Sequence, residues 1–217
     1  MPIDVSADYL IWEGDGTRTI TYTSRQSPTS DLAAQVATYT LRRAVSAREV
    51  AASNGRYTGS DVNFHVPAGL LPYTAKPGDL ITDSDGTDYR VLDASLETLS
   101  SRWKCVCRNP VIAYQLYDLI NVEEPALTLD ASGAAVRTWT ETYRQVHCRV
   151  QPEEAAVHDS FGTRGQYIRY TVYLSKELVI DAREARVIWK DLTLDVIRYR
   201  SSEVLEALPT LEVELRS

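Results

Sequence analysis

The stretch from residue 186 to residue 216 constrains the fold more than any other part of the sequence. β-Branched and aromatic residues dominate 185–189 and 192–199, which flank the polar pair Lys190-Asp191, and residues 211–216 alternate apolar with charged side chains. Two such runs around a short polar break are typical of a β-hairpin, and alternation with a period of two is typical of a strand with one buried face. The stretch therefore predicts antiparallel β-structure.

The rest of the sequence repeats this pattern. Strand-like runs at residues 8–12 and 17–23 flank one turn, and runs at 79–82 and 89–92 flank another. Both turns contain Asp and Gly, which suit the backbone angles of tight turns. Only a helical turn near 47–52 interrupts the strand character clearly. Together these segments predict an all-β chain with long loops and little helix.

The order of elements in the first half recurs in the second. This recurrence predicts two tandem small antiparallel β-barrel or β-sandwich domains, 1–109 and 110–217, each of a size typical of a small domain. The alternative is that any two all-β halves share a strand-turn-strand order. The predicted correspondences are 10–11 with 119–120, 19–22 with 127–130, 41–45 with 147–151, the helical turn 49–51 with 154–156, the loop 55–59 with 162–165, the hairpin turn 85–87 with 191–193, and 103–108 with 211–216.

Composition excludes several classes of protein. A net charge of −7 argues against a surface built to neutralise phosphates. The start of the sequence has no signal-peptide pattern, and no apolar run is long enough to span a bilayer, so we expect neither export nor membrane insertion. Three cysteines cannot all pair within one chain, and Cys105 and Cys107 would share one strand face. Reduced, structural thiols in a cytosolic setting are the simplest interpretation.

The residues that could carry chemistry are few and scattered. A metal site built on His147 and His158 would need a third ligand, such as Asp159 or Cys148, and no zinc-type spacing is present. The Asp and Gly residues at 83–88 depart from the spacing of a calcium loop and indicate a turn. No nucleophile elbow, phosphate loop or dinucleotide-binding fingerprint occurs. We therefore predict no catalytic site, no metal and no cofactor.

Tyrosine and arginine mark the surfaces on which we expect contacts. Thirteen tyrosines and four tryptophans against two phenylalanines form an amphipathic aromatic set that suits interfaces. In residues 167–174 the even positions should face the core. The loops 46–60 and 153–166 contain glycine and arginine and could reach a neighbour's carboxylates, although a solvated loop is the alternative. The predicted interface residues are Arg56, Tyr57, Phe161, Arg164, Tyr167, Arg169 and Tyr173.

The second half, and less closely the first, resembles the head-tail joining (head-closure or adaptor) proteins of tailed bacteriophages. The resemblance rests on an opening strand (145–151), a long loop (153–166), a long strand (167–174), a hairpin (185–199) and a closing strand (211–216), and in the first half on the hairpin segments 78–81 and 86–92. The chain departs from the family by carrying two modules where one is usual.

This resemblance implies a virion structural protein of the neck, assembled in the cytoplasm of the bacterial host. The expected partners are further copies of the chain in a homo-oligomeric ring, the portal or adaptor and tail proteins, and genomic DNA that passes without sequence-specific binding. The acidic net charge suits a channel that must not hold phosphates tightly. Two alternatives stay open: another tail or capsid protein, such as a tail terminator or decoration protein, and a carbohydrate-binding β-sandwich in which Trp12 or Trp139 stacks on sugar rings.

Overall fold

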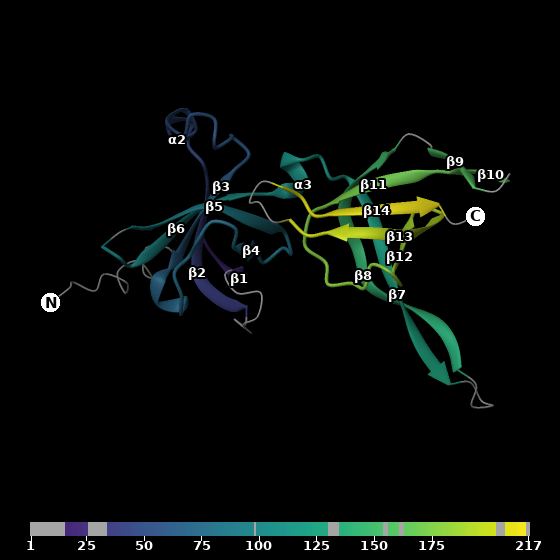
Figure 1. Cartoon of the computed structure of the whole chain (residues 1–217). Helices are drawn as coiled ribbons and strands as arrows, with labels where there is room; N and C mark the ends of the chain where they lie inside the picture. The colour runs from purple at the N-terminus through teal and green to yellow at the C-terminus, as the bar shows by residue number, and fades with distance from the viewer. Residues whose placement is uncertain are drawn as a thin grey trace. The chain divides into compact units, whose positions relative to one another are not determined.

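The computed structural model describes residues 16–25, 34–97, 99–129, 135–153, 156–160, 163–202 and 207–215, with the backbone alone at 156–160 and 163–167. The chain divides into two compact units, Met1–Ala113 and Tyr114–Ser217. Nearly all regular structure in both units is β-strand (Figure 1). The prediction of an all-β chain with little helix is confirmed.

The first unit is a closed barrel of antiparallel strands in the order β1-β2-β3-β6-β5-β4, in which β4 pairs back onto β1. The short helix α2 connects β2 to β3, and the short helix α3 follows β6. The elements of this unit are β1 (Thr17–Thr23), β2 (Gln35–Ala44), α2 (Ala47–Ala52), β3 (Val62–Pro67), the 3-10 turn η1 (Ala68–Leu70), β4 (Leu80–Thr82), β5 (Asp88–Glu97), β6 (Arg102–Arg108) and α3 (Pro110–Ala113).

The second unit is also a closed barrel, with the order β11-β14-β13-β12-β7-β8, and a separate two-stranded sheet of β9 and β10 is inserted between β8 and β11. Its elements are β7 (Asp118–Leu129), β8 (Ala135–Pro152), β9 (Ala156–Ser160), β10 (Thr163–Tyr167), β11 (Arg169–Leu174), β12 (Arg186–Trp189), β13 (Leu192–Arg200) and β14 (Thr210–Leu215). When β9 and β10 are set aside, the strands follow the same ring order as in the first barrel. The prediction of two tandem antiparallel barrels is confirmed.

The two barrels also share their irregularities. The β1·β2 and β7·β8 ladders each contain a β-bulge, and in each case a non-glycine residue beside it has a positive φ, 55° at Tyr39 and 49° at Gln145. The β5·β6 and β13·β14 ladders are bulged as well. Bulges bend a strand and increase its twist, which helps a small sheet to close. The same device therefore closes both barrels.

Two predicted correspondences between the halves were wrong, that of 10–11 with 119–120 and that of 19–22 with 127–130, because residues 119–120 already belong to the strand that corresponds to β1. In the second barrel β7 holds the place of β1, and its buried residues Ile120 and Val122 parallel Ile20 and Tyr22. Residues 127–130, predicted as the counterpart of 19–22, instead begin in an exposed outer part of β7. Apolar-polar alternation with a period of two occurs both in the part of a strand that belongs to a barrel and in a part that extends beyond it. The pattern therefore could not distinguish these two parts of β7. The predicted strand at 8–12 lies outside the described residues.

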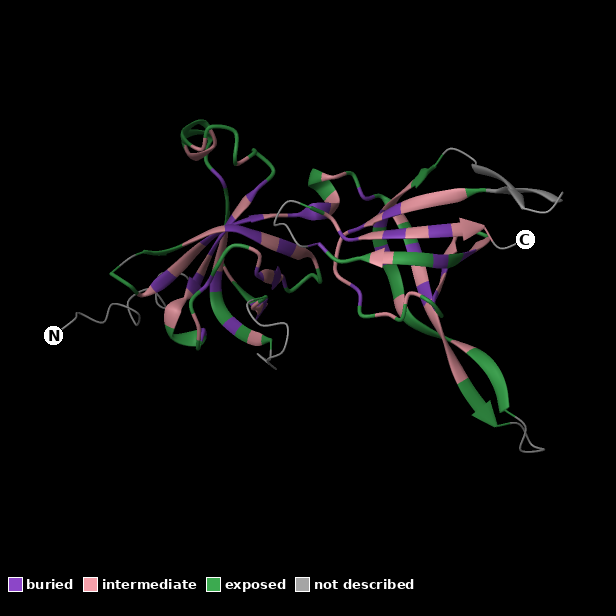
Figure 2. Cartoon of the chain, viewed as in Figure 1, coloured by how far each residue is buried: buried purple, intermediate pink, exposed green. Residues whose placement is uncertain are grey.

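Each barrel encloses its own apolar core, and the strands alternate buried with more exposed residues (Figure 2). Phe64 and Tyr89 meet edge-on in the first core, with ring centroids 5.2 Å apart. Cys105 and Cys107 are both buried there, while Cys148 is buried in the second core, and all three thiols are free. Burial raises the pKa of Cys105 and of Cys148 to about 12. The prediction of structural, unpaired thiols with Cys105 and Cys107 on one face is confirmed.

Of the three predicted hairpin turns, the one between 8–12 and 17–23 lies almost entirely outside the described residues, and the other two are present. Lys190, in the turn between β12 and β13, has a φ of 53°. Between β4 and β5, Gly86 has a φ of 80°, and the Asp83 amide donates to the Thr87 carbonyl at 2.9 Å. A positive φ is accessible to glycine without steric cost, which is why Asp-Gly marked this turn in the sequence. Asp83 itself is almost fully buried, which the turn pattern did not indicate.

Two predictions for the second barrel need correction. The long loop at 153–166 is a hairpin, since Val157 pairs with Gln166 and Arg164 with Asp159 in the β9·β10 ladder. The hydrogen bonds of this ladder satisfy the backbone N–H and C=O groups of the long segment. The sequence has no period-two alternation there, which is why a loop was predicted. The inward pattern of β11 holds for Val172 and Leu174, which are fully buried, but Ile168 precedes the strand and is exposed.

Candidate functional site

The helix α2 begins with a reciprocal cap. Ser46 is the N-cap residue, and its hydroxyl accepts a hydrogen bond from the Glu49 amide at 3.3 Å, while the Glu49 carboxylate accepts one from the Ser46 amide at 2.8 Å. This capping box satisfies two backbone N–H groups that the helix cannot satisfy itself. None of the residues of α2 is buried. Its position therefore depends on polar contacts rather than on packing.

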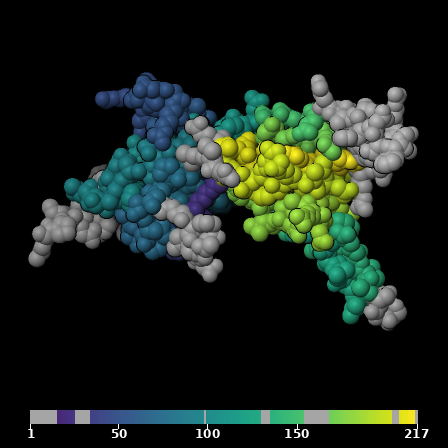
Figure 3. Space-filling view, viewed as in Figure 1, coloured from purple at the N-terminus to yellow at the C-terminus, as the bar shows by residue number. Residues whose placement is uncertain are grey.

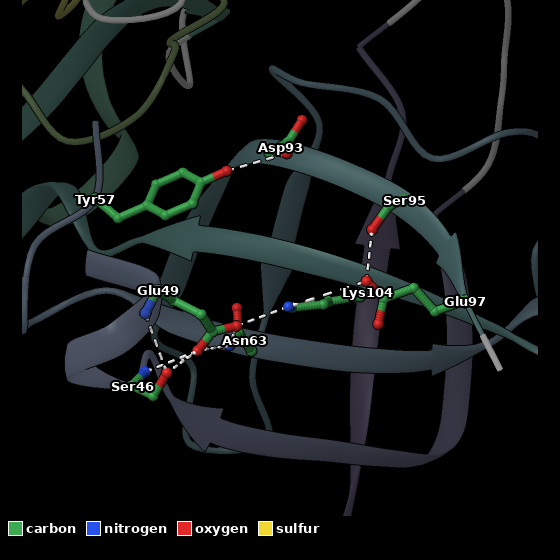
Figure 4. A network of polar contacts seen from close by, with 8 residues as sticks. All are labelled: Ser46, Glu49, Tyr57, Asn63, Asp93, Ser95, Glu97 and Lys104. Atoms are coloured by element: carbon green, nitrogen blue, oxygen red, sulfur yellow. Dashed lines mark hydrogen bonds and ion pairs between the residues drawn. The ribbon is translucent and has the colours of Figure 1, made fainter. Parts of the chain in front are cut away.

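The carboxylate of Glu49 supplies those contacts (Figure 4). Lys104 of β6 donates to it at 2.7 Å, and the Asn63 amide of β3 donates at 3.2 Å. The hydrogen bond from Lys104, followed by those from the hydroxyl and amide of Ser46, lowers the pKa of Glu49 to about 2. One side chain thus caps α2 and ties it to two strands of the first barrel.

A cleft of about 440 Å³ opens beside this network. Its walls come from α2 and the segment that follows it, and from outward-facing residues of β5 and β6. The lining mixes three carboxylates with two cationic groups, so most of its charge is compensated locally. The lining residues are Glu49, Ala52, Ser53, Arg56, Tyr57, Asp93, Ser95, Glu97, Lys104 and Val106.

Arg56 and Tyr57, two of the predicted interface residues, lie in this cleft. The Tyr57 hydroxyl donates to Asp93 at 3.0 Å, and burial, followed by that hydrogen bond, raises the pKa of Tyr57. The Arg56 guanidinium donates to the Leu92 carbonyl at 2.9 Å and lies 5.9 Å from the centre of the Tyr57 ring. Both side chains are therefore held against β5 and present a fixed, polar surface rather than a flexible loop.

The polar side chains that line the cleft already have partners within the first barrel. The described lining of the cleft contains neither histidine nor cysteine, and its one basic amine, Lys104, is engaged by Glu49. The paired donors and acceptors suit hydrogen bonding to the polar surface of another protein.

The remaining predicted interface residues lie in the second unit. Arg169 of β11 forms an ion pair with Glu214 of β14 at 3.2 Å. Tyr173, four residues further along β11, lies under the Arg149 guanidinium, which is 5.0 Å from the ring centre. Both side chains stand on the outer face of the barrel, as the alternation predicted. Phe161 lies outside the described residues, and only the backbone of Arg164 and Tyr167 is described, in β10.

The sequence reasoning missed two leucines of β7 that are among the most exposed large apolar residues in the described parts of the chain. Leu127 and Leu129 of β7 are 79% and 75% exposed, and they face Arg137 and Ala135 of β8 across the ladder. Apolar-polar alternation on both sides of residues 130–134, which include a glycine in the sequence, was the available signal. The alternation was instead assigned to a repeat of the strand at 19–22.

Trp139, a candidate for stacking on sugars, is already occupied by cations. The guanidinium of Arg186 lies 3.9 Å from its ring centre, and that of Arg137 lies 5.0 Å away. Arg186 is itself held by Glu123 at 2.6 Å. A sugar ring would have to displace these contacts. Trp12, the other candidate, lies outside the described residues.

Across the described parts of the chain, no three His, Cys, Asp or Glu side chains come close enough together to hold a metal ion. His147 is exposed on β8, and of His158 only the backbone in β9 is described. Nor does any described helix have the length and apolar character needed to cross a membrane.

Comparison with known proteins gives little that bears on identity. The sequence matches no known protein family. It also matches no curated protein. Among solved structures, a chain from the virion of a native gene transfer agent particle is similar over 44% of this chain and 90% of its own length, at 12% identity and a TM-score of 0.35. These comparisons assign the chain to no family.

Proposed function

We propose that the chain is a non-enzymatic structural protein of a tailed-phage or phage-like virion. More specifically, we propose a head-tail connector, or head-closure subunit, that forms a homo-oligomeric ring around the DNA channel and joins portal to tail. The observation that carries the proposal is that the chain contains two closed barrels with the same strand order. Each barrel has an additional segment between its second and third strands, α2 in the first and the β9·β10 hairpin in the second. Rigid barrels with projecting elements suit a subunit that must hold neighbours in fixed positions.

The elements on which the resemblance to head-closure proteins rests support this proposal. The opening strand, the long strand, the hairpin and the closing strand correspond to β8, β11, β12 with β13, and β14, which all belong to the second barrel. The shared ring order and the shared bulges further support an origin of the two barrels by duplication of one module.

The electrostatics support a channel role more than a DNA-binding role. The chain has a net charge of −7, and cations of both barrels are paired with carboxylates, as in Arg108 with Asp61 and Arg186 with Glu123. A protein that holds DNA needs free cations to release counterions from phosphates. We expect no retention of duplex DNA by the purified protein in a mobility-shift assay at low salt, where such contacts are strongest.

Mass spectrometry of purified particles tests the proposal directly. We expect peptides of this chain in tailed particles at a few copies per virion, as a neck ring requires, and not at the hundreds expected of a decoration protein. Localised cryo-microscopy reconstruction then separates a neck ring from a tail terminator. Absence of the chain from particles would contradict the virion role.

A further inference from the structure

The hairpin of β7 and β8 extends well beyond the second barrel (Figure 1). Pairing of β7 with β12 stops at Glu123, and pairing of β8 with β11 involves only residues 148–152. Residues 124–129 and 135–140, called the arm below, therefore pair only with each other. The arm stands out from the body of its barrel as a narrow projection (Figure 3).

One face of the arm is apolar and exposed. Residues directly opposite each other in an antiparallel ladder share a face, so Pro125 with Trp139, Leu127 with Arg137, and Leu129 with Ala135 form one side. Hydroxyls on the other side brace the ribbon, as the Thr138 hydroxyl donates to the Ala126 carbonyl at 3.1 Å. A two-stranded ribbon alone in water is marginal, and a clustered exposed apolar face marks an interaction site.

The first barrel carries an apolar groove of about 330 Å³. The one charged residue of its described lining, Arg102, donates to the backbone carbonyls of Tyr39 and His65 at 3.3 Å, so its guanidinium is directed toward the backbone. Tyr39 and Leu70 are exposed at the mouth. The groove is lined by Thr38, Tyr39, Pro67, Gly69, Leu70, Ser101 and Arg102.

Charge at the two surfaces is complementary. Arg137 lies on the apolar face of the arm, and no described carboxylate pairs with it. Glu97 lines the neighbouring cleft rather than the groove, but it lies directly across the β5·β6 ladder from Arg102 of the groove. Its side chain is 44% exposed, and its contact with Lys104 is long, at 4.0 Å, so the carboxylate stays accessible to a second cation. A cation among leucines on one surface and an exposed carboxylate beside an apolar groove on the other suit a contact between the two.

We propose that the arm of one copy binds in the groove of another copy, with Leu127 and Leu129 covering Tyr39 and Leu70, and Arg137 pairing with Glu97. The two surfaces differ, so the contact is head-to-tail, and repetition closes a ring when the rotation between copies allows it. The choice of a second copy as the occupant rests on the proposed ring function. The contact names the surfaces by which such a ring would assemble.

Cysteine cross-linking between two separately purified full-length variants tests the contact. Leu127→Cys protein is mixed with Leu70→Cys protein under mild oxidation, and disulfide-linked heterodimer is followed on non-reducing gels. The control replaces Leu70→Cys by Val179→Cys, because Val179 is 86% exposed and lies outside both the groove and the arm. The native thiols are buried and contribute little background. We expect cross-linking at least tenfold faster in the first mixture.

Equal rates in the two mixtures would overturn the proposal, as would faster Leu127→Cys homodimers, which indicate arm-to-arm contact. A Leu127→Cys/Leu70→Cys double variant that links only within one chain would also overturn it. Both parent variants change residues with exposed side chains, and circular dichroism verifies that they are folded.

A charge exchange provides a second test. Arg137→Glu and Glu97→Arg, each alone, should slow the cross-link several-fold, and the two combined in one chain should restore it. Failure of the combination to restore the rate would overturn the ion pair and, with it, the predicted alignment. Failure here, with the protein still present in particles, leaves the virion role standing. If the cross-link forms but the protein is absent from particles, the contact between copies stands and the virion role is contradicted.

Discussion

The first barrel buries several carboxylates, whereas the buried residues of the second barrel are almost all apolar. Asp61, Asp79 and Asp83 are almost completely buried in the first unit, whereas Ser202 is the only polar residue buried among the described residues of the second. Asp83 pairs with Arg18 and Arg42, from β1 and β2, at 3.0 and 2.9 Å. These ties join segments far apart in sequence. Their carboxylate is fully buried, whereas the carboxylates in ion pairs of the second barrel, such as Glu123 with Arg186, are partly exposed.

Asp79 illustrates how such a group is held. It accepts hydrogen bonds from the Tyr22 hydroxyl at 2.7 Å and from the Lys76 amide at 3.0 Å. Burial, more than this hydrogen bond, raises the pKa of Tyr22. The second barrel has a tyrosine-carboxylate tie at a different place, on β13, and it is partly exposed: Tyr199 donates to Glu177 at 2.6 Å. A buried polar group costs free energy unless all its partners are present, so the first barrel should tolerate fewer substitutions.

The largest expected effect is from Asp61→Asn. The Arg108 guanidinium donates to both Asp61 oxygens, at 2.9 and 2.8 Å, and the Asp61 side chain is fully buried. Removing one charge of a buried pair costs about 3 to 5 kcal/mol. The control in the second barrel is Glu212→Gln, whose partner Arg200 is largely exposed, for which we expect less than about 1 kcal/mol. Urea unfolding followed by amide signals of each barrel measures both, and equal losses would remove the contrast.

A smaller effect is expected from Glu49→Gln. The substitution removes the acceptor charge of the capping box and the ion pair to Lys104, so α2 should fray at a cost of about 1 kcal/mol. Amide hydrogen exchange across residues 46–53 should rise, while exchange in β3 and β6 stays unchanged. Glu97→Gln is the control, because its contact with Lys104 is 4.0 Å long. Unchanged exchange in α2 would show that the carboxylate does not hold the helix.

The same network predicts a pH dependence confined to the first unit. The pKa of Glu49 falls from about 4.5 to about 2 on folding, so its contribution is complete above pH 4.5 and is lost as the pH drops to 2. Carbon-13 NMR titration of the side-chain carboxyl should give a midpoint near the lower value. A midpoint near 4.5 would mean that the contact with Lys104 is not formed in solution.

Deleting residues 161–165 should change the stability of the second barrel by less than about 0.5 kcal/mol, as for a surface change away from the core. The reason is that β9 and β10 pair only with each other among the described strands. We expect the deletion to impair assembly or genome retention in particles. Unfolding of the second barrel would place this hairpin in its core, and fully infectious particles would exclude it as an interface.

The three cysteine thiols should not react with a thiol reagent while the protein is folded. Burial raises the pKa of Cys105 and Cys148 to about 12 and that of Cys107 well above its usual value. At about pH 8, near the pKa of a free thiol, Ellman's reagent should therefore label none of the three until denaturant is added. Labelling of Cys148 alone would show that the second barrel opens more readily than the first.

The sequence by itself determined the local elements. Alternation with a period of two located β6, β12, β13 and β14, Asp-Gly marked the turn before β5, and the shared order of elements indicated two barrels. These features depend on residues that are neighbours in sequence, whose backbone preferences act whatever the rest of the chain does.

Only the tertiary structure decided which of these elements carry the contacts. The burial of Asp83 depends on Arg42 and Arg18, which are 41 and 65 residues away, and nothing near Asp83 in sequence separates it from an exposed turn residue. The exposed face of the arm is set by where β7 stops pairing with β12, and the hairpin of β9 and β10 is set by a ladder with no local signal. Burial and pairing depend on partners that only the folded chain brings together, and this is why they could not be predicted from neighbouring residues.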